Sequence, residues 1–312
     1  MDILLQALGG IAGILLLYYG ADMLIRGGVS IAAKLKVPPL IVGLTLVAFS
    51  TGAPELVVSI DAAFKGSGDI SIGNIIGSNI CNTALILGIC ALISPLKVNR
   101  KLFRSDLPML IAASVVMAAC CLIFRGVDRW QAGIFLAWLI LYTAGNIVSG
   151  RQNSGGEEDS GGRIFPLGLA LLFVAAGAAG LVAGARLFVD AAIFFAALAH
   201  ISDAVIGLTV VAFGTSLPEL AASVVASLKG EQDIAVGNVV GSNIFNIVGI
   251  LGIAPMIRPI RASEIDLTDF SVMLGMTLLL YLFVRSGEKL DRKEGFCLFA
   301  GYLAYSVYLF VK

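Results

Sequence analysis

The sequence predicts an all-α integral membrane protein with about ten transmembrane helices in two inverted five-helix repeats. Three observations lead to this fold class. The 312 residues are 58% hydrophobic and only 13% charged, whereas a soluble chain carries about 25% charged residues. Several stretches are long and apolar enough to cross a bilayer. Finally, a segment of 40 residues occurs twice, at 43–82 and 207–246.

The predicted spans are apolar stretches of about 20 residues, the length that an α-helix needs to cross the hydrocarbon core. The N-terminal stretch opens MDILLQ, with an acid where a signal peptide would be basic, so we interpret it as a retained first helix. The ten spans lie near residues 3–25, 39–64, 71–94, 106–124, 130–148, 164–186, 203–228, 234–256, 267–284 and 295–311.

A polar, Gly/Ser-rich segment at 149–163 separates the two sets of five spans. Such a composition is typical of a flexible linker. We therefore divide the chain into a first half, residues 1–148, and a second half, residues 164–312, with the linker on the cytoplasmic side.

The basic residues predict the orientation of these helices. The loops after helices 1, 3, 5, 7 and 9 hold 14 of the 21 Lys and Arg residues. Because basic loops favour the cytoplasm, both termini are predicted to lie outside it, in a plasma or inner membrane. Five helices per half is an odd number, so the second half must be inverted, as in many secondary transporters.

The first and sixth helices also carry a related pair of charges. Asp22 and Arg26 lie four residues apart, and Arg186 and Asp190 follow at an offset of 164 with the signs exchanged. Residues four apart are neighbours on a helix face. Each pair is either a charge pair near a helix end or a contact that changes as these helices move.

The duplicated segment contains the chemistry. The first copy begins GLTLVAFSTGAPEL and ends GNIIGSNICN, and the second begins GLTVVAFGTSLPEL and ends GNVVGSNIFN. They align at a constant offset of 164 with 23 of 40 positions identical. Each copy places one glutamate, Glu55 or Glu219, directly after a proline. A charged carboxylate at mid-bilayer costs about 2.5–3.5 kcal/mol, so the two acids predict a protein that handles a cation.

Other oxygen atoms surround each glutamate in the sequence. Pro54 and Pro218 lack an N–H and disrupt the helical ladder four residues back, which frees backbone carbonyls at 48–51 and 212–215. Such irregular backbone is tolerated at membrane depth only where it faces protein or a water-filled cavity. Hydroxyl groups within one turn of the acids come from Thr51, Thr215 and Ser216.

A polar stripe follows in each copy. Its members are spaced by four residues and therefore share one helix face: Asn74, Ser78 and Asn82 in the first copy, and Asn238, Ser242 and Asn246 in the second. The alternative is that these side chains only hold helices together, and it applies most to Asn74, Asn79, Asn238 and Asn243. Glycines at small-x-x-x-small spacing in both stripes also favour close helix packing.

These donors are all oxygens, without a cluster of sulfur or imidazole. Hard oxygen ligands that include carboxylates suit Ca²⁺. Two carboxylates neutralise one divalent ion, and they equally neutralise monovalent ions or protons taken in its place. A site that binds either ion in turn, between repeats that can rock, predicts an antiporter.

The two motifs resemble the alpha repeats of the calcium/cation antiporter superfamily, and most of all those of prokaryotic sodium/calcium exchangers. The resemblance covers helices 2, 3, 7 and 8 closely and the ten-helix plan overall. It implies that helices 1 and 6 form a sliding gate. It implies a Ca²⁺ site made by Glu55, Glu219 and the carbonyls of Thr51 and Thr215. It implies Na⁺ ligands at the backbone of Ala48 and Ala212 and the hydroxyls of Ser216, Ser78 and Ser242, with Asn82 and Asn246 at the central polar positions.

The first copy departs from this pattern at one ligand. It has Thr51-Gly52 where the second has Thr215-Ser216, so one hydroxyl is missing. Ser50, where the other copy has Gly214, is the candidate substitute hydroxyl. The resemblance also implies that potassium-dependent members have an aspartate at the position of Asn246. The asparagine at this position therefore argues against potassium co-transport.

The sequence therefore predicts exchange of Ca²⁺ for Na⁺ across the cell membrane. The alternative is a Ca²⁺/H⁺ antiporter, because both glutamates can take a proton and Gly52 removes a sodium ligand. No metalloprotease or serine-hydrolase motif is present, so no enzyme and no cofactor are predicted. A passive channel is disfavoured because paired carboxylates would hold a divalent ion tightly. The predicted partners are Ca²⁺, Na⁺ and the lipid bilayer, with no nucleic acid and no obligate protein partner.

Overall fold

The computed structural model describes residues 2–152, 164–199, 212–261 and 265–311. Across these ranges the chain is helical apart from four two-residue strands, and η denotes a π-helical segment. The first half contains α1 (Asp2–Leu35), α2 (Pro39–Val42), η1 (Gly43–Val47), α3 (Ala48–Thr51), α4 (Ala53–Lys65), α5 (Gly68–Ile80), η2 (Cys81–Ile86), α6 (Leu87–Ile93), β1 (Leu96–Lys97), η3 (Leu102–Asp106), α7 (Leu107–Phe124), β2 (Gly126–Val127) and α8 (Arg129–Gln152). The second half contains α9 (Leu167–Leu198), α11 (Ala212–Gly214), α12 (Leu217–Leu228), α13 (Gln232–Ile244), η5 (Phe245–Ile250), α14 (Leu251–Ile257), β3 (Ile260–Arg261), α15 (Leu267–Gly287), β4 (Lys289–Leu290) and α16 (Arg292–Val311).

The helices confirm a multi-pass membrane fold. Seven helices in the described ranges, named at the end of this paragraph, are candidate spans. The bent pair Pro39–Thr51 and Ala53–Lys65 adds an eighth if the pair is taken as one span. α12 is a shorter apolar helix, and the beginning of the predicted span near 203–228 lies outside the described residues, as does most of the predicted linker. The count of ten spans therefore stays a prediction. Seven helices in the described ranges are long and apolar enough to cross a membrane: Ile3–Leu35, Gly68–Ile93, Leu102–Phe124, Arg129–Gly150, Leu167–Leu198, Gln232–Ile257 and Leu267–Gly287.

The first and sixth helices are longer than the sequence predicts. α1 has 34 residues and α9 has 32, which gives each a length of about 50 Å at 1.5 Å per residue. The hydrocarbon core is only about 30 Å thick. α1 continues past Asp22 and Arg26 because these two charged side chains pair with each other along the helix, with 2.8 Å between Arg26 Nε and Asp22 Oδ2. α1 ends before Lys36, which has a positive φ of 53°.

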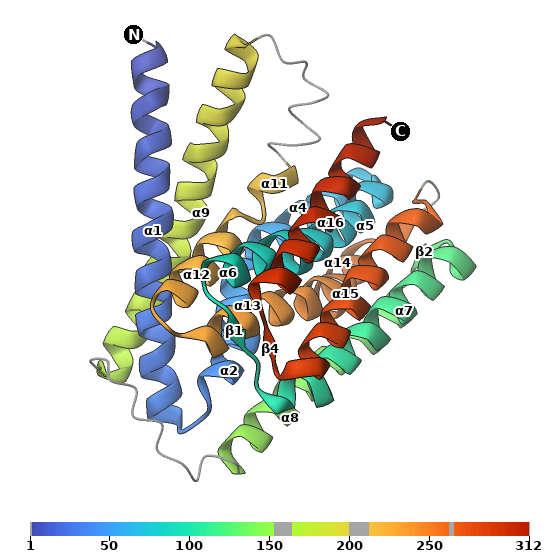
Figure 1. Ribbon diagram of the computed structural model, residues 1–312. Helices are drawn as coiled ribbons and strands as arrows, with labels where there is room; N and C mark the ends of the chain where they lie inside the picture. The colour runs from blue at the N-terminus through green and yellow to red at the C-terminus, as the bar shows by residue number, and fades with distance from the viewer. Residues whose placement is uncertain (1, 153–163, 200–211, 262–264, 312) are drawn as a thin grey trace.

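α1 and α9 pack against each other backbone to backbone. They stand side by side at one edge of the bundle, in antiparallel directions (Figure 1). A Cβ atom at Gly20 would lie 2.9 Å from the Gly177 carbonyl oxygen, and one at Gly13 would lie 2.8 Å from the Gly184 carbonyl oxygen. Any side chain at these positions would push the helices apart, so the glycines allow the close approach.

The two helices that carry the polar stripes form the centre of the molecule. In the spans Gly68–Ile93 and Gln232–Ile257, 83% and 100% of the most apolar window is buried, compared with 17% in α1. Each contains a π-helical segment, η2 or η5, at equivalent positions of the duplicated sequence. π-Helical turns are often found at functional sites.

Short contacts tie the two halves together at their ends. β1 pairs with β4, and β2 pairs with β3, both antiparallel. Arg129 at the start of α8 donates to the Ile257 carbonyl at 3.4 Å, and Arg292 at the start of α16 donates to the Ile93 carbonyl at 3.5 Å. Each of these contacts joins a segment of the first half to a segment of the second half.

Candidate cation-binding site

Glu55 and Glu219 each lie in the first turn of a helix that follows a break in a longer helical run. α4 and α12 both carry a proline at the start, where its missing N–H removes no helical hydrogen bond. The first run bends by 47° at its break. Both glutamate side chains are 0% exposed. The positive end of each helix dipole favours the negative charge of its glutamate.

The two glutamates belong to different halves, but the turns that carry them lie close together. Their carboxylates are close enough to interact electrostatically. The Ser216 hydroxyl, from the second half, donates to Glu55 Oε1 at 3.4 Å. The break before α12 thus faces the glutamate of α4, which brings the two duplicated motifs together as the sequence predicts.

Thr51 makes the matching contacts from the first half. It is 0% exposed, and its hydroxyl donates to Asn238 Oδ1 at 3.1 Å and lies 3.4 Å from Ser242 Oγ. Thr51 also lies beside Glu219. The stripe of α13 therefore contacts the break before α4 across the two halves.

The remaining stripe residues line the same buried region. Ser78 lies beside Glu55 and is 4% exposed. Asn82 and Asn246 are 0% exposed and are the second residues of the π-helical segments η2 and η5. Within the described residues, neither amide has a hydrogen-bond partner on either its nitrogen or its oxygen.

The unpartnered atoms include charged oxygens. Both carboxylate oxygens of Glu219 and Glu55 Oε2 accept no hydrogen bond from the described residues. Buried polar atoms in proteins are nearly always paired, because an unpaired one costs about 1–3 kcal/mol. These atoms therefore need a partner that the described residues do not supply, such as a cation and its water molecules.

The backbone ligands that the sequence predicts are less open than expected. The Ala48 carbonyl accepts the Gly52 N–H at 2.9 Å and the Thr51 hydroxyl at 3.4 Å, so it already has two partners within the chain. Ala212 begins α11, and Thr215 lies in the turn between α11 and α12, where it is half-buried. The helical ladder therefore continues to Gly52, two residues before Pro54, rather than being open at Ala48.

Two asparagines clamp the backbone of the glutamates. Asn74 Nδ2 donates to the Glu55 carbonyl at 3.2 Å and to Ser59 Oγ at 3.1 Å. Asn238 Nδ2 donates to the Glu219 carbonyl at 3.4 Å and to Ser223 Oγ at 2.9 Å. These contacts fix the turn from which each carboxylate projects.

The serines of these clamps were missed by sequence reasoning. Ser59 and Ser223 each lie four residues after their glutamate and are identical in the two copies. Both are 0% exposed. That spacing on a helix face was the signal that could have identified them.

Three other candidate polar residues have partners elsewhere. The Ser50 hydroxyl donates to the Leu46 carbonyl of its own helix at 2.7 Å, so it does not replace the hydroxyl missing at Gly52. Asn79 donates to Met273 Sδ at 3.8 Å. Asn243 donates to Thr83 Oγ1 at 2.7 Å. The amide nitrogen of each asparagine thus has a partner, whereas its Oδ1 is buried without one among the described residues.

The donor set is made of oxygen atoms with two negative charges. The described residues hold no group of three or more His, Cys, Asp or Glu that could bind a metal, which argues against a zinc-type or multi-acid site. Two carboxylates with hydroxyl, amide and carbonyl oxygens match the preference of Ca²⁺ for hard ligands. The same oxygens also suit Na⁺.

The long helix α1 is held against this core by an ion pair. Asp22 pairs with Lys229, which follows α12, as well as with Arg26 of its own helix. Burial lowers the pKa of Lys229. Arg186 and Asp190 are both exposed and form no ion pair with each other. Only the first of the two predicted charge pairs therefore forms.

Comparison with known proteins finds a family and a solved structure that match almost the whole chain. A family model described as sodium/calcium exchanger protein matches residues 5–148 and 169–311. The sodium/calcium exchanger MaX1 of Methanosarcina acetivorans is 34% identical, with 96% of each chain covered. The inner membrane protein YrbG of Escherichia coli is 36% identical, with 96% of this chain and 95% of YrbG covered. The solved structure of the sodium-calcium exchanger NCX_Mj, soaked with zero Na⁺ and Ca²⁺, superposes with a TM-score of 0.85 at 34% identity over 98% of this chain and 99% of that one.

Proposed function

This chain belongs to the sodium/calcium exchanger family, and we propose that it exchanges Ca²⁺ for Na⁺ across the cytoplasmic membrane by alternating access. The family consists of ion exchangers rather than enzymes. One observation carries the proposal: two glutamates from the two halves are fully buried, and most of their oxygens have no partner among the described residues. Similarity to the named Na⁺/Ca²⁺ exchangers supports the choice of ions.

The proposed ligands follow the geometry of the site. Ca²⁺ is bound between the carboxylates, and the monovalent cations bind at flanking positions where the carboxylates are shared with hydroxyls. The contact of Ser216 with Glu55 supports one such flanking position. The Ca²⁺ ligands are Glu55, Glu219 and the carbonyls of Thr51 and Thr215; the Na⁺ or shared ligands are Ala48, Ala212, Ser216, Ser78, Ser242, Asn82 and Asn246.

The exchange follows from charge balance. The two carboxylates are compensated by one Ca²⁺, or by monovalent cations that replace it, and the empty site leaves two negative charges buried together. Because uncompensated buried charges are costly, the site changes sides more readily when loaded than when empty. This obligation to carry an ion in each direction is what makes the protein an antiporter.

The proposed topology has ten helices in two inverted halves, 1–148 and 164–312, joined by the cytoplasmic linker 149–163, with both termini outside the cytoplasm. The equivalent positions of the paired strands support it: β1 and β3 are related by an offset of 164, and each pairs with a strand of the other half. The excess of basic residues in alternate loops supports the orientation.

Ca²⁺ flux in proteoliposomes tests the proposal. The full-length protein should take up radiolabelled Ca²⁺ when an outward Na⁺ gradient is imposed at constant pH. Glu55→Gln and Glu219→Gln should each abolish uptake, whereas Glu288→Gln, at an exposed ion pair with Arg100, should retain it. Flux driven only by a pH gradient in Na⁺-free medium would instead identify a Ca²⁺/H⁺ antiporter. Unchanged uptake in either buried glutamate variant would refute the site.

A further inference from the structure

The two halves of the site differ around one aromatic ring. Phe245 of η5 lies where the first copy has Cys81, and it meets Gly52, which lies where the second copy has Ser216. A Cβ atom at Gly52 would lie 3.0 Å from Phe245 Cδ1. In the other half the smaller Cys81 lies beside the Ser216 hydroxyl. One half therefore pairs a glycine with an aromatic ring, and the other pairs a serine with a thiol.

A second glycine, Gly249, also leaves room for this ring. A Cβ atom at Gly249, one turn after Phe245, would lie 2.5 Å from Phe245 Cδ2 and 2.7 Å from Cε2. The ring therefore lies along its own helix, over Gly249, with one edge against Gly52. The equivalent of Gly249 in the first copy is Leu85, where a large side chain is compatible with Cys81. Three positions thus differ together between the copies.

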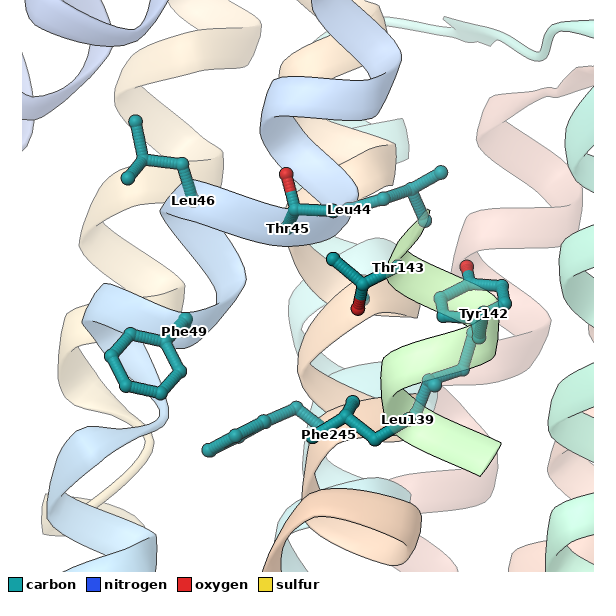
Figure 2. Close-up of a pocket in the computed structure, with 10 residues that line it drawn as sticks. Leu44, Thr45, Leu46, Phe49, Leu139, Tyr142, Thr143 and Phe245 are labelled. Carbon is teal, nitrogen blue, oxygen red and sulfur yellow. The ribbon is translucent and has the colours of Figure 1, made fainter. Parts of the chain in front are cut away.

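The ring lines an apolar pocket as well as contacting Gly52. Phe245 is 5% exposed, and with Phe49 it lines a pocket of about 310 Å³ between η1, α3, α8 and α13. The two rings lie with centroids 5.2 Å apart, and Figure 2 shows the Phe245 side chain reaching toward Phe49. Phe245 therefore presents carbon atoms at a boundary where its counterpart Cys81 borders a serine hydroxyl.

The glutamates differ in the same way. Glu55 Oε1 accepts a hydrogen bond from Ser216. Glu219, which would receive the equivalent contact from residue 52, has no hydrogen-bonded oxygen among the described residues. Thr51 lies beside Glu219, but the hydrogen bonds of its hydroxyl go to the Ala48 carbonyl, Asn238 and Ser242. The Gly52 side of the site therefore lacks an oxygen ligand, and the aromatic ring fills the adjoining space.

We propose that Phe245, admitted by Gly52 and Gly249, takes the place of one monovalent-cation position, so that each Ca²⁺ is exchanged for one monovalent cation fewer than a site with serine in both halves would require. The inference rests on the proposed function and adds its coupling ratio. It assigns Gly52 and Phe245 together as the pair that sets this ratio, because Gly52 lacks the hydroxyl ligand and Phe245 fills the adjoining space. The remaining flanking position is the one formed by Ser216 and Glu55.

Competition between Na⁺ and Ca²⁺ tests the number of cations directly. Binding of radiolabelled Ca²⁺ to the purified full-length protein is measured over a range of Na⁺ concentrations at constant pH. By linkage, the slope of the logarithm of the apparent Kd against the logarithm of Na⁺ concentration gives the number of Na⁺ ions displaced. The double variant Gly52→Ser/Phe245→Cys reproduces the pairing of Ser216 with Cys81 on the other side of the site. Its slope should exceed that of the wild type by about one, so that a tenfold rise in Na⁺ weakens Ca²⁺ binding about tenfold further.

Two further variants keep the test decisive. Phe245→Cys alone opens space without adding an oxygen and should leave the slope unchanged. Ser216→Ala removes the hydroxyl of the retained position and should lower the slope by about one, and this variant needs no repacking around Phe245. An unchanged slope in Ser216→Ala, or equal slopes in the wild type and a monodisperse double variant, would overturn the proposal.

The outcome also distinguishes this inference from the proposed function. If the wild type binds no Ca²⁺, the proposed function is wrong and the inference falls with it. If Ca²⁺ is displaced by protons but not by Na⁺, Na⁺ coupling is wrong, and the same difference of one is read from the slope against pH. If Ca²⁺ binds and Na⁺ competes with equal slopes in all variants, only the inference is wrong.

Discussion

The Ser216 hydroxyl of the second half donates to Glu55 Oε1 of the first half at 3.4 Å. The two residues are 161 positions apart, and the contact joins the two duplicated segments at their helix breaks. No described residue makes the equivalent contact with Glu219. The site is therefore built from two related halves that are not chemically equal, and the difference generates predictions for each glutamate.

Neutralising Glu219 should stabilise the protein in the absence of ions. Its two buried oxygens lack partners among the described residues, so Glu219→Gln removes an uncompensated charge and should raise the free energy of unfolding in Ca²⁺-free buffer by about 1–3 kcal/mol. The same variant should lose the stabilisation that added Ca²⁺ gives to the wild type. Thermal unfolding with and without Ca²⁺ measures both effects. The exposed Glu288→Gln should stay within about 0.5 kcal/mol of the wild type, and a larger shift there would undermine the comparison.

Removing an asparagine clamp should weaken ion binding. Asn238→Ala breaks the contacts with the Glu219 carbonyl and with Ser223, which should cost about 1–3 kcal/mol of stability and increase the Kd for Ca²⁺. Asn79→Ala is the matched control, because this buried amide donates to Met273 rather than to a glutamate backbone. It should lose stability without a change in Kd. Equal effects on Kd in both variants would show that the clamp has no special role.

The ion pair between Asp22 and Lys229 should affect the rate of exchange rather than the affinity. The pair joins α1 to the end of α12, so Lys229→Met should destabilise the conformation that contains it. The maximal exchange rate should change by up to about fivefold, the equivalent of about 1 kcal/mol. The Ca²⁺ concentration at half-maximal rate should not change. Arg26→Met removes the partner of Asp22 within the same helix and should leave the rate as it is. A rate change of the same size in Arg26→Met would contradict the assignment.

The glycine contact between α1 and α9 should not tolerate a methyl group. A Cβ at Gly20 would lie 2.9 Å from a backbone oxygen of α9, so Gly20→Ala forces the helices apart and should cost about 1–3 kcal/mol. Gly9→Ala on the same helix meets nothing within 4 Å and should be neutral or gain up to about 1 kcal/mol in helix propensity. Thermal unfolding of the two variants compares them directly. Equal stability would mean that the close approach is not needed.

The hydrogen bonds at Asp291, which cap the start of α16, should make the stability of the protein depend on pH in the acid range. Asp291 Oδ1 accepts the N–H groups of Glu294 at 2.9 Å and Lys293 at 2.8 Å, and these bonds, that of Glu294 foremost, lower the pKa of Asp291. A carboxyl whose pKa is lowered by folding contributes stability above its unfolded pKa of about 3.9, and this contribution is lost as the pH falls through the folded pKa. The unfolding temperature of the wild type should therefore fall more steeply than that of Asp291→Asn between about pH 5 and pH 2. Parallel curves would refute the prediction.

The sequence by itself determined the membrane fold and the identity of the central acids. Apolar stretches of bilayer length leave the backbone no alternative to helices, because its polar groups find no partners in lipid. A duplicated glutamate in such sequence indicates an ion site whatever the packing. These properties depend on composition and local spacing, which the chain carries without reference to its fold.

Only the tertiary structure decided which oxygens meet and which do not. Thr51 contacts Asn238 across 187 residues, Ser50 turns its hydroxyl to its own helix, and Phe245 occupies the space beside Gly52. Each outcome depends on how two helices from different halves approach each other, and side-chain packing at such a crossing changes with shifts smaller than a methyl group. The duplicated sequence predicts the pairing of the two halves, but the ring of Phe245 makes them unequal.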